Sequence, residues 1–225
     1  MHQPTPLPEQ PPLRIAVLGS SYPRSQDDPC VPWLREIVTR TAALGHSVTV
    51  LAPSFEGLAS HPIDGIPVRR WRYAPARWEN LTHDEGAPNK VHSILPKLLA
   101  IPYILLGALA VLRWARKDRY DVIHCHWPFP HGLMTLLPQR LLGIRVVAMC
   151  HGAELALGRK SGRIRRVLGW LLDGMDAVCT NSSHTAGEVN AISSPDNVHV
   201  LPYGATVEAP DLSGSTSQDP PLLLN

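Results

Sequence analysis

Short apolar runs alternate with longer amphipathic segments along this chain. Brief runs rich in branched residues predict strands at residues 13–18, 47–51, 66–71, 122–125, 146–150, 177–180 and 198–201. Apolar residues at helical spacing predict helices at residues 31–44, 94–115, 131–142 and 162–172, and a short helix that Ser182 or Ser183 caps. This alternation predicts an α/β fold, a Rossmann-like, doubly wound and mainly parallel sheet with helices on both faces.

The apolar pattern also divides the chain into regions. Residues 1–12 are rich in proline, without the basic start and apolar core of a signal peptide, and predict a disordered tail before the domain of residues 13–207. Residues 74–89 lack a period and predict a long surface loop. Residues 208–221 have the composition of a linker, and residues 222–225 begin another apolar run. We therefore expect a C-terminal domain to be missing.

Charge and cysteine usage narrow the classes of function. The 225 residues carry 21 Lys and Arg against 19 Asp and Glu, a formal net charge of +2, which argues against overall commitment to nucleic acid. The four cysteines are widely spaced and form no CxxC pair or disulfide framework. We expect a cytoplasmic protein.

Five short motifs follow one another in a fixed order. They are Gly45-His46-Ser47-Val48-Thr49-Val50, Asp121-Val122-Ile123-His124, His151-Gly152-Ala153-Glu154, Asp176-Ala177-Val178 and Leu201-Pro202-Tyr203-Gly204. In this order and spacing they resemble the N-terminal, acceptor-side half of a glycosyltransferase family 4 enzyme over residues 13–207. The resemblance implies one half of a GT-B architecture, in which two Rossmann-like domains face each other across a cleft.

The resemblance also implies an activity and its partners. Such an enzyme moves a sugar, with retention, from a nucleotide diphosphate donor to a carbohydrate or lipid-linked acceptor, and no further cofactor is expected. The family's donor-binding groups lie in the C-terminal domain, so we expect this chain alone to be inactive. Two alternatives remain open: a non-catalytic pairing subunit of a split enzyme that needs a partner chain, and a fragment of a sugar-phosphate epimerase with a similar architecture.

Candidate site residues follow two predicted strands, at the edge where open α/β sheets hold their ligands. The resemblance assigns His151 a catalytic position beside the donor sugar, and Gly152 would let backbone approach a ligand closely. It places Gly19 and Ser20 near the donor diphosphate. Glu154 could orient the loop, bind an acceptor hydroxyl, or be a solvated helix start favoured by the helix dipole.

Histidines near residue 125 raise the question of a metal site. His124, Cys125, His126, His131 and His151 include residue types that bind zinc. Packed or hydrogen-bonded histidines at the end of a strand are the favoured reading, so we expect no metal. The first loop lacks the glycines of a dinucleotide fingerprint, which argues against an NAD-dependent dehydrogenase.

Two segments raise the question of a membrane. Residues 98–112 are apolar throughout, which is typical of a helix buried on every side; a membrane-contacting surface is the alternative. A basic cluster precedes and begins a predicted helix and indicates either an anionic neighbour or a solvated face. Its members are Arg159, Lys160, Arg163, Arg165 and Arg166. Peripheral contact with the inner face of the membrane is therefore possible.

Overall fold

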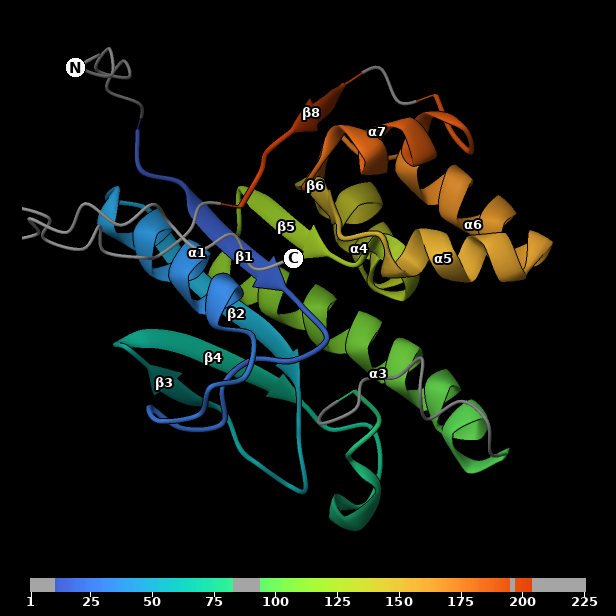
Figure 1. Cartoon of the computed structure of the whole chain (residues 1–225). Coiled ribbons are helices and arrows are strands. Elements are labelled where there is room, and N and C mark those ends of the chain that lie inside the picture. Colours follow the sequence, from blue (N-terminus) through green and yellow to red (C-terminus); the bar gives the residue numbers. More distant parts are fainter. Residues whose placement is uncertain (1–10, 83–93, 195–196, 204–225) are drawn as a thin grey trace, which may run out of the picture.

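The structure, a computed structural model, describes residues 11–82, 94–194 and 197–203 (Figure 1). One eight-stranded sheet runs through the described residues in the order β3-β4-β2-β1-β5-β6-β7-β8. Its strands are β1 (Arg14–Leu18), β2 (Ser47–Pro53), β3 (His61–Ile63), β4 (Ile66–Trp71), β5 (Val122–His126), β6 (Arg145–Cys150), β7 (Ala177–Thr180) and β8 (Val198–Val200). All neighbouring strands are parallel except β3 and β4, which are antiparallel. The mainly parallel sheet expected from the sequence is confirmed.

Helices connect these strands and cover both faces of the sheet (Figure 1). They are α1 (Pro32–Ala43), η1 (Ala76–Trp78), α3 (Ile94–Asp118), α4 (Pro128–Leu142), α5 (Ala153–Lys160), α6 (Gly162–Asp173) and α7 (Ser183–Asn190). Side chains alternate between faces along a strand. Val17 of β1 accordingly packs with α1, whereas Leu18 packs with α3 and α4 on the opposite face.

Close helix packing on the second face depends on one glycine. A Cβ atom on Gly107 of α3 would lie 2.7 Å from the sulfur of Met134 in α4. Because real Cβ atoms do not approach other atoms so closely, glycine allows the two helices to meet here. α6 continues this layer beyond α4, since Leu171 of α6 packs beside Gly132 of α4.

The segment predicted to be a surface loop, residues 74–89, is partly built into the core. Glu79 is completely buried, and its carboxylate accepts hydrogen bonds from Ser54 Oγ at 2.9 Å, from Gly57 N at 3.0 Å and from Tyr73 N at 3.1 Å. Arg72 Nε donates to the same carboxylate at 2.6 Å. One buried acid with several donors thus fixes the segment as far as residue 82, and residues 83–89 lie outside the described part.

The structure adds two elements and corrects the expectation for α3, and other expectations fall on residues that it does not describe. The sequence did not predict the strand β3 or the helix α5, which follows Gly152 directly. α3 was expected to be buried on every side, but only one side packs in the core and the other is exposed. The expected tail of residues 1–12 lies outside the described residues except for residues 11 and 12, and the expected linker and the apolar run of residues 222–225 lie wholly outside them.

Candidate functional site

His151 follows β6 at the carboxyl edge of the sheet, as the sequence predicts. Its half-buried ring stacks on Trp127 with the centroids 4.5 Å apart, and lies 4.9 Å from the ring of Trp33. Tyr203 and His126 complete this aromatic cluster at 5.9 and 5.3 Å. The cluster joins the start of α1, the end of β5, the β6 loop and the segment after β8. Such rings offer flat apolar surface beside polar atoms, which suits the face of a sugar or a base.

Both ring nitrogens of His151 are hydrogen-bonded within the protein. The Tyr203 hydroxyl lies 2.7 Å from Nδ1, and His126 Nδ1 lies 3.1 Å from Nε2. Burial, followed by the nearby His124, lowers the pKa of His151 to about 4. The imidazole is therefore neutral at neutral pH, and each of its two contacts is completed by a single proton. A ligand that bonds to this ring must displace the Tyr203 hydroxyl or the His126 ring.

The rest of the β6 loop holds His151 in place. Gly152 has φ +97°, a conformation that residues with a Cβ atom rarely adopt, and no atom lies within 4 Å of the position a Cβ would take. Glu154, in the first turn of α5, is 1 % exposed and its Oε1 accepts the backbone N–H of His151 at 2.8 Å. Burial raises the pKa of this carboxyl. The solvated helix start considered for Glu154 is wrong, because the side chain is buried and orients the loop.

Gly19 and Ser20 lie at the same edge but at a different strand. They follow β1, which β5 separates from β6, so about 10 Å divides the two loops. Gly19 is buried, donates its N–H to Leu51 O at 3.0 Å, and would place a Cβ 3.4 Å from Leu34 of α1. Gly19 thus packs against α1, and its N–H is already bonded within the protein.

The five basic residues lie on two adjacent helices and differ in their partners. Arg159 and Lys160 end α5, and the other three lie in α6 after the capping residue Ser161. Arg159 forms an ion pair with Glu188, and Arg165 donates to Ala191 O at 2.9 Å. Arg163 and Arg166 are exposed and have no ion-pair partner among the described residues. Those two cations remain available to an outside anion.

The histidines near residue 125 are packed, and His126 and His131 are also hydrogen-bonded. His131 is buried beneath the start of α4, where Tyr103 Oη lies 2.8 Å from its Nε2. Its Nδ1 faces two carbonyl oxygens at 3.1 Å, so Nδ1 carries the proton and Nε2 accepts from the tyrosine. In the described ranges, no group of three or more His, Cys, Asp or Glu side chains could hold a metal ion.

Several cluster residues were not predicted as site residues. Trp33 and Tyr203 come from opposite ends of the domain, and His126 was expected to be a packed or hydrogen-bonded histidine. Trp127 has φ +52°, a left-handed conformation that is uncommon for a bulky residue and tends to occur at functional sites. A signal for two of them was present, since Tyr203 lies in the last motif and Trp33 directly follows the first loop.

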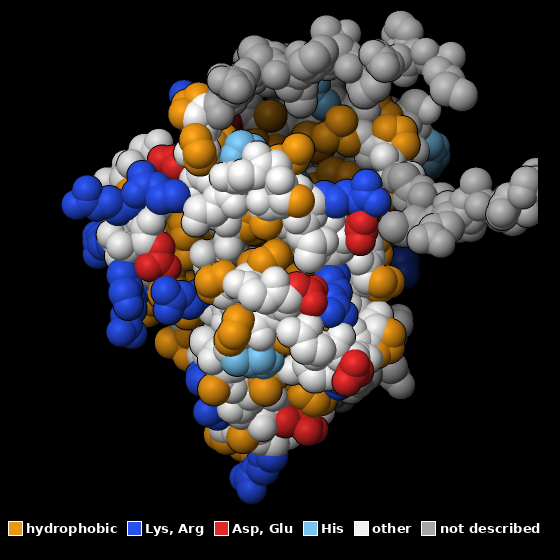
Figure 2. All heavy atoms as spheres, turned by 90° about the vertical axis from the view of Figure 1, so that its left-hand side faces the viewer, with side chains coloured by type: hydrophobic (Ala, Val, Ile, Leu, Met, Phe, Trp, Pro, Cys, Tyr) orange, Lys and Arg blue, Asp and Glu red, His pale blue; other side chains and the backbone are white. Residues whose placement is uncertain are grey.

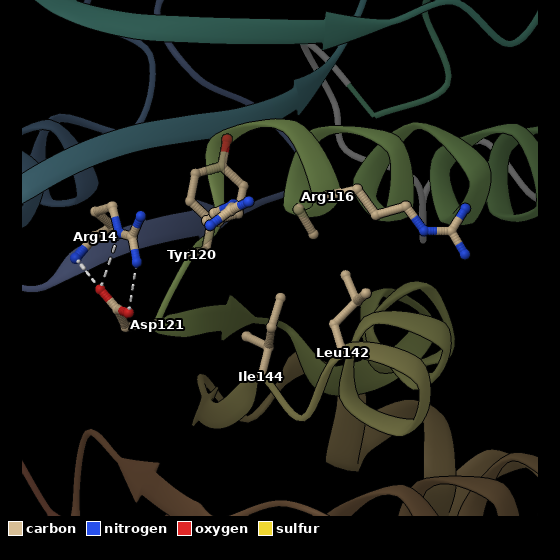
Figure 3. Close-up of a pocket in the computed structure, with 8 residues that line it drawn as sticks. Arg14, Arg116, Tyr120, Asp121, Leu142 and Ile144 are labelled. Atoms are coloured by element: carbon tan, nitrogen blue, oxygen red, sulfur yellow. Dashed lines mark hydrogen bonds and ion pairs between the residues drawn. The ribbon is translucent and has the colours of Figure 1, made fainter.

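Other motif residues lie at the opposite, amino edge of the sheet. Asp121 Oδ2 accepts the backbone N–H of Arg14 at 2.8 Å, and Asp121 also forms an ion pair with the Arg14 side chain (Figure 3). Asp176 Oδ2 accepts the N–H of Val146 at 2.7 Å. A hollow of about 300 Å³ opens beside Arg14 and Asp121, and a second of about 330 Å³ lies between β4 and α3. Neither hollow is lined by His151.

Comparison with known proteins identifies the family. The sequence model of Glycosyltransferase Family 4 matches residues 33–209. N-acetyl-alpha-D-glucosaminyl L-malate synthase of Bacillus anthracis is 22 % identical over 97 residues, which are 42 % of this chain and 26 % of that protein. The chain thus spans about a quarter of the length of this curated relative.

Solved structures share the fold. Sucrose-phosphate synthase from Thermosynechococcus elongatus superposes with a TM-score of 0.54 at 13 % identity, covering 86 % of this chain and 90 % of that one. HepE of Anabaena, determined in complex with UDP and glucose, gives 0.54 at 14 % identity and covers 86 % of this chain and 45 % of HepE. Because the family match covers most of the chain, the protein belongs to Glycosyltransferase Family 4.

Proposed function

We propose that this chain is the acceptor-side half of a retaining glycosyltransferase, which moves a sugar from a nucleotide diphosphate donor to a carbohydrate or lipid-linked acceptor in the cytoplasm. The observation that carries the proposal is the position of His151, half-buried at the carboxyl edge among Trp33, Trp127 and Tyr203. HepE, which shares the fold, was determined with UDP and glucose. In this proposal residues 13–207 form the domain, residues 208–221 a linker, and residues 222–225 the beginning of a donor-binding domain.

The proposed role of His151 follows from its chemistry. A neutral imidazole can accept a hydrogen bond from a sugar hydroxyl. Its N–H can also donate to an oxygen that gains negative charge as the donor phosphate departs. The aromatic rings around it would bind the apolar face of the sugar and exclude water. When the sugar binds, it would replace the Tyr203 hydroxyl at Nδ1, while His126 holds the other side of the ring.

Other residues support this ring. Glu154 acts as a positioning residue, because it holds the His151 backbone from a buried site. Gly152 leaves open space where a side chain would otherwise stand, which allows a ligand to approach the backbone. Gly19 and Ser20 would approach the donor diphosphate from the loop after β1, the next strand but one from β6.

A transfer assay tests the proposal. Residues 1–225 and the longest polypeptide encoded by the reading frame would be incubated with UDP-, GDP- and ADP-sugars and with carbohydrate and lipid-linked acceptors. Mass spectrometry would detect the product, and NMR its anomeric configuration. We expect no turnover by residues 1–225 alone, and transfer with retention by a form that also carries the donor-binding groups.

Two histidine variants form a matched pair in this assay. His151→Ala should lower kcat by about 10²- to 10³-fold, the usual loss of one polar transition-state contact. His46→Ala removes a histidine at the amino edge, where Nδ1 accepts Leu13 N at 3.2 Å, and should leave kcat unchanged. Normal turnover by residues 1–225, or an active His151→Ala enzyme, would contradict the proposal. Turnover only after a second chain is added would assign the protein to a split enzyme.

A further inference from the structure

One side of α3 exposes a row of large apolar residues to solvent. Leu98, Ile101, Leu105 and Leu109 are 59, 60, 60 and 58 % exposed. Their spacing of three or four residues places them on one face of the helix, along about 16 Å. The opposite side of α3, including Val111, is buried in the core. A soluble surface rarely carries so many exposed leucines in one contiguous row.

Neighbouring helices extend this row. α4 and α6 cover the same face of the sheet as α3, so their outward sides point in the same direction. α4 exposes Leu137 and Leu141, and α6 exposes Trp170, which is 49 % exposed. Arg140 of α4 lies over the Trp170 ring, 5.9 Å from its centroid. We call the exposed sides of α3, α4 and α6 the outer helical face.

Cations surround the apolar row, and acids are nearly absent. After Leu109 the same side of α3 continues with the exposed residues Arg113 and Arg116. From residue 94 to residue 142 the only acids in the sequence are Asp118 and Asp121, and each is paired with an arginine. The cations of this stretch are Lys97, Arg113, Arg116, Lys117, Arg119 and Arg140. The α3 and α4 part of the outer helical face is therefore apolar and cationic at once.

Two hollows lie at the margins of this face. One, of about 330 Å³, is lined by Leu106, Leu109 and Arg113 of α3 together with residues of β4. The other, of about 300 Å³, lies between Arg116 and Leu142 at the amino edge (Figure 3). Figure 2 looks toward that edge and shows Lys and Arg side chains gathered along one side of the view. Each hollow offers an arginine beside apolar side chains, a combination that suits a phosphate attached to an acyl chain.

The packing of α3 favours contact with a membrane surface over a membrane span. Among the described helices, Lys97–Asp118 is the one long and apolar enough to cross a bilayer by length and composition, with a mean hydropathy of 1.9. Its inner side, however, packs against β1, β5 and α4 in the core. Crossing a bilayer would require removing that side from the core, whereas lying on the surface requires no change of fold.

We propose that the outer helical face docks on an anionic lipid bilayer. Leu98, Ile101, Leu105 and Leu109 enter the boundary between head groups and acyl chains, and Arg113 and Arg116 contact lipid phosphates. Arg163 and Arg166, exposed on α6 together with Trp170, extend the cationic contact. These four arginines have no ion-pair partner within residues 11–82, 94–194 and 197–203, and their charge complementarity with anionic head groups favours a bilayer as the occupant. The inference does not depend on the proposed sugar transfer.

Vesicle flotation tests this surface. The chain is expected to float with vesicles of phosphatidylcholine and phosphatidylglycerol in equal amounts, and only weakly with phosphatidylcholine alone. Leu105→Gln with Leu109→Gln should lower binding by about 100-fold, tenfold for each leucine withdrawn from the bilayer. Arg113→Gln with Arg116→Gln should lower binding to the anionic vesicles by about 25-fold and leave the weak neutral binding unchanged.

A matched control separates the surface from exposed leucines in general. Leu44 is 71 % exposed at the end of α1, on the other face of the sheet, and Leu44→Gln should bind vesicles like the unchanged chain. Circular dichroism and thermal unfolding would establish that each variant is folded. Absence of flotation by the unchanged chain, or undiminished flotation of Leu105→Gln with Leu109→Gln, overturns the proposal. If the chain does not bind vesicles but forms a dimer, and Leu105→Gln with Leu109→Gln makes it monomeric, the face binds a second copy of the chain instead.

Discussion

The two edges of the sheet carry residues of the same motifs but use them differently. At the amino edge, His46, Asp121 and Asp176 each accept a backbone N–H from the first residues of a neighbouring strand or from the residue just before it. At the carboxyl edge, His151 and Tyr203 bond to each other among aromatic rings. Motifs that identify the family thus divide between holding strand register and building a candidate site.

The chemistry of each edge explains this division. An N–H at the start of a strand that finds no backbone acceptor needs a nearby side chain as its partner, and a carboxylate or an imidazole can accept it. The carboxyl edge instead concentrates buried imidazoles. Burial lowers the pKa of His124, His131 and His151 to about 4, and it also holds the pKa of His126 well below its usual value. The side chains of the amino edge thus stabilise the fold, whereas the carboxyl edge contains imidazoles that stay neutral.

Lowering the pH should have the largest effect, because it destabilises the buried histidines of the carboxyl edge. A histidine whose folded pKa is about 4 stays neutral while its unfolded form, near 6.5, takes up a proton, so stability is lost as pH falls from about 6.5 to 4. For the buried His131 alone the loss approaches about 3 kcal/mol. Glu154, whose pKa is raised by burial, acts in the opposite direction and offsets a part.

Urea unfolding at several pH values measures this effect. Because Asp121 has its pKa lowered by its hydrogen bonds with Arg14, its contribution is lost only below about pH 4, outside the histidine window. The slope of the unfolding free energy against pH reports the number of protons taken up on unfolding. Between pH 6.5 and 4, His151→Phe should lower that number by about one. A free energy of unfolding that stays constant over this range would show that the imidazoles are accessible to protons in the folded state.

Substituting two glycines should have a smaller effect on stability and separate the role of the carboxyl edge in transfer from backbone strain alone. Gly152 at the carboxyl edge and Gly143 at the end of α4 both have positive φ, of +97° and +65°, and open space around a Cβ. Gly152→Ala and Gly143→Ala should each cost about 1 to 3 kcal/mol of backbone strain in thermal unfolding. Only Gly152→Ala should also impair transfer, because it displaces the loop that carries His151. Equal transfer by the two variants would place the ligand elsewhere.

The smallest effect is expected at the amino edge. Asp176→Ala leaves the N–H of Val146 without its acceptor and should lower the free energy of unfolding by about 1 kcal/mol. Transfer by the folded variant should be unchanged. A loss of transfer at full stability would mean that the amino edge is coupled to the site.

Much of this architecture can be predicted from sequence periodicity, and the elements that cannot be predicted have physical reasons. The apolar runs at β1, β2, β5, β6 and β7 and the helical spacing of α1 and α4 are strong enough to predict those elements. β3 has three residues with Pro62 in the middle, which resembles a turn. Glu79 lies in a polar segment, and only its four donors show why it is buried. Long-range contacts such as Tyr203 with His151, 52 residues apart, have no local signal.

The direction of α3 has a further consequence. α3 runs antiparallel to the strands, and its Tyr103 lies near His131 just beyond the carboxyl end of β5, whereas Asp118 lies just before β5 begins. The row of exposed leucines therefore starts near the site and leads away from it. If the row rests on a bilayer, the aromatic cluster is held within a helix length of the lipid plane. An acceptor with a lipid tail would then arrive by lateral diffusion in two dimensions, without first leaving the membrane.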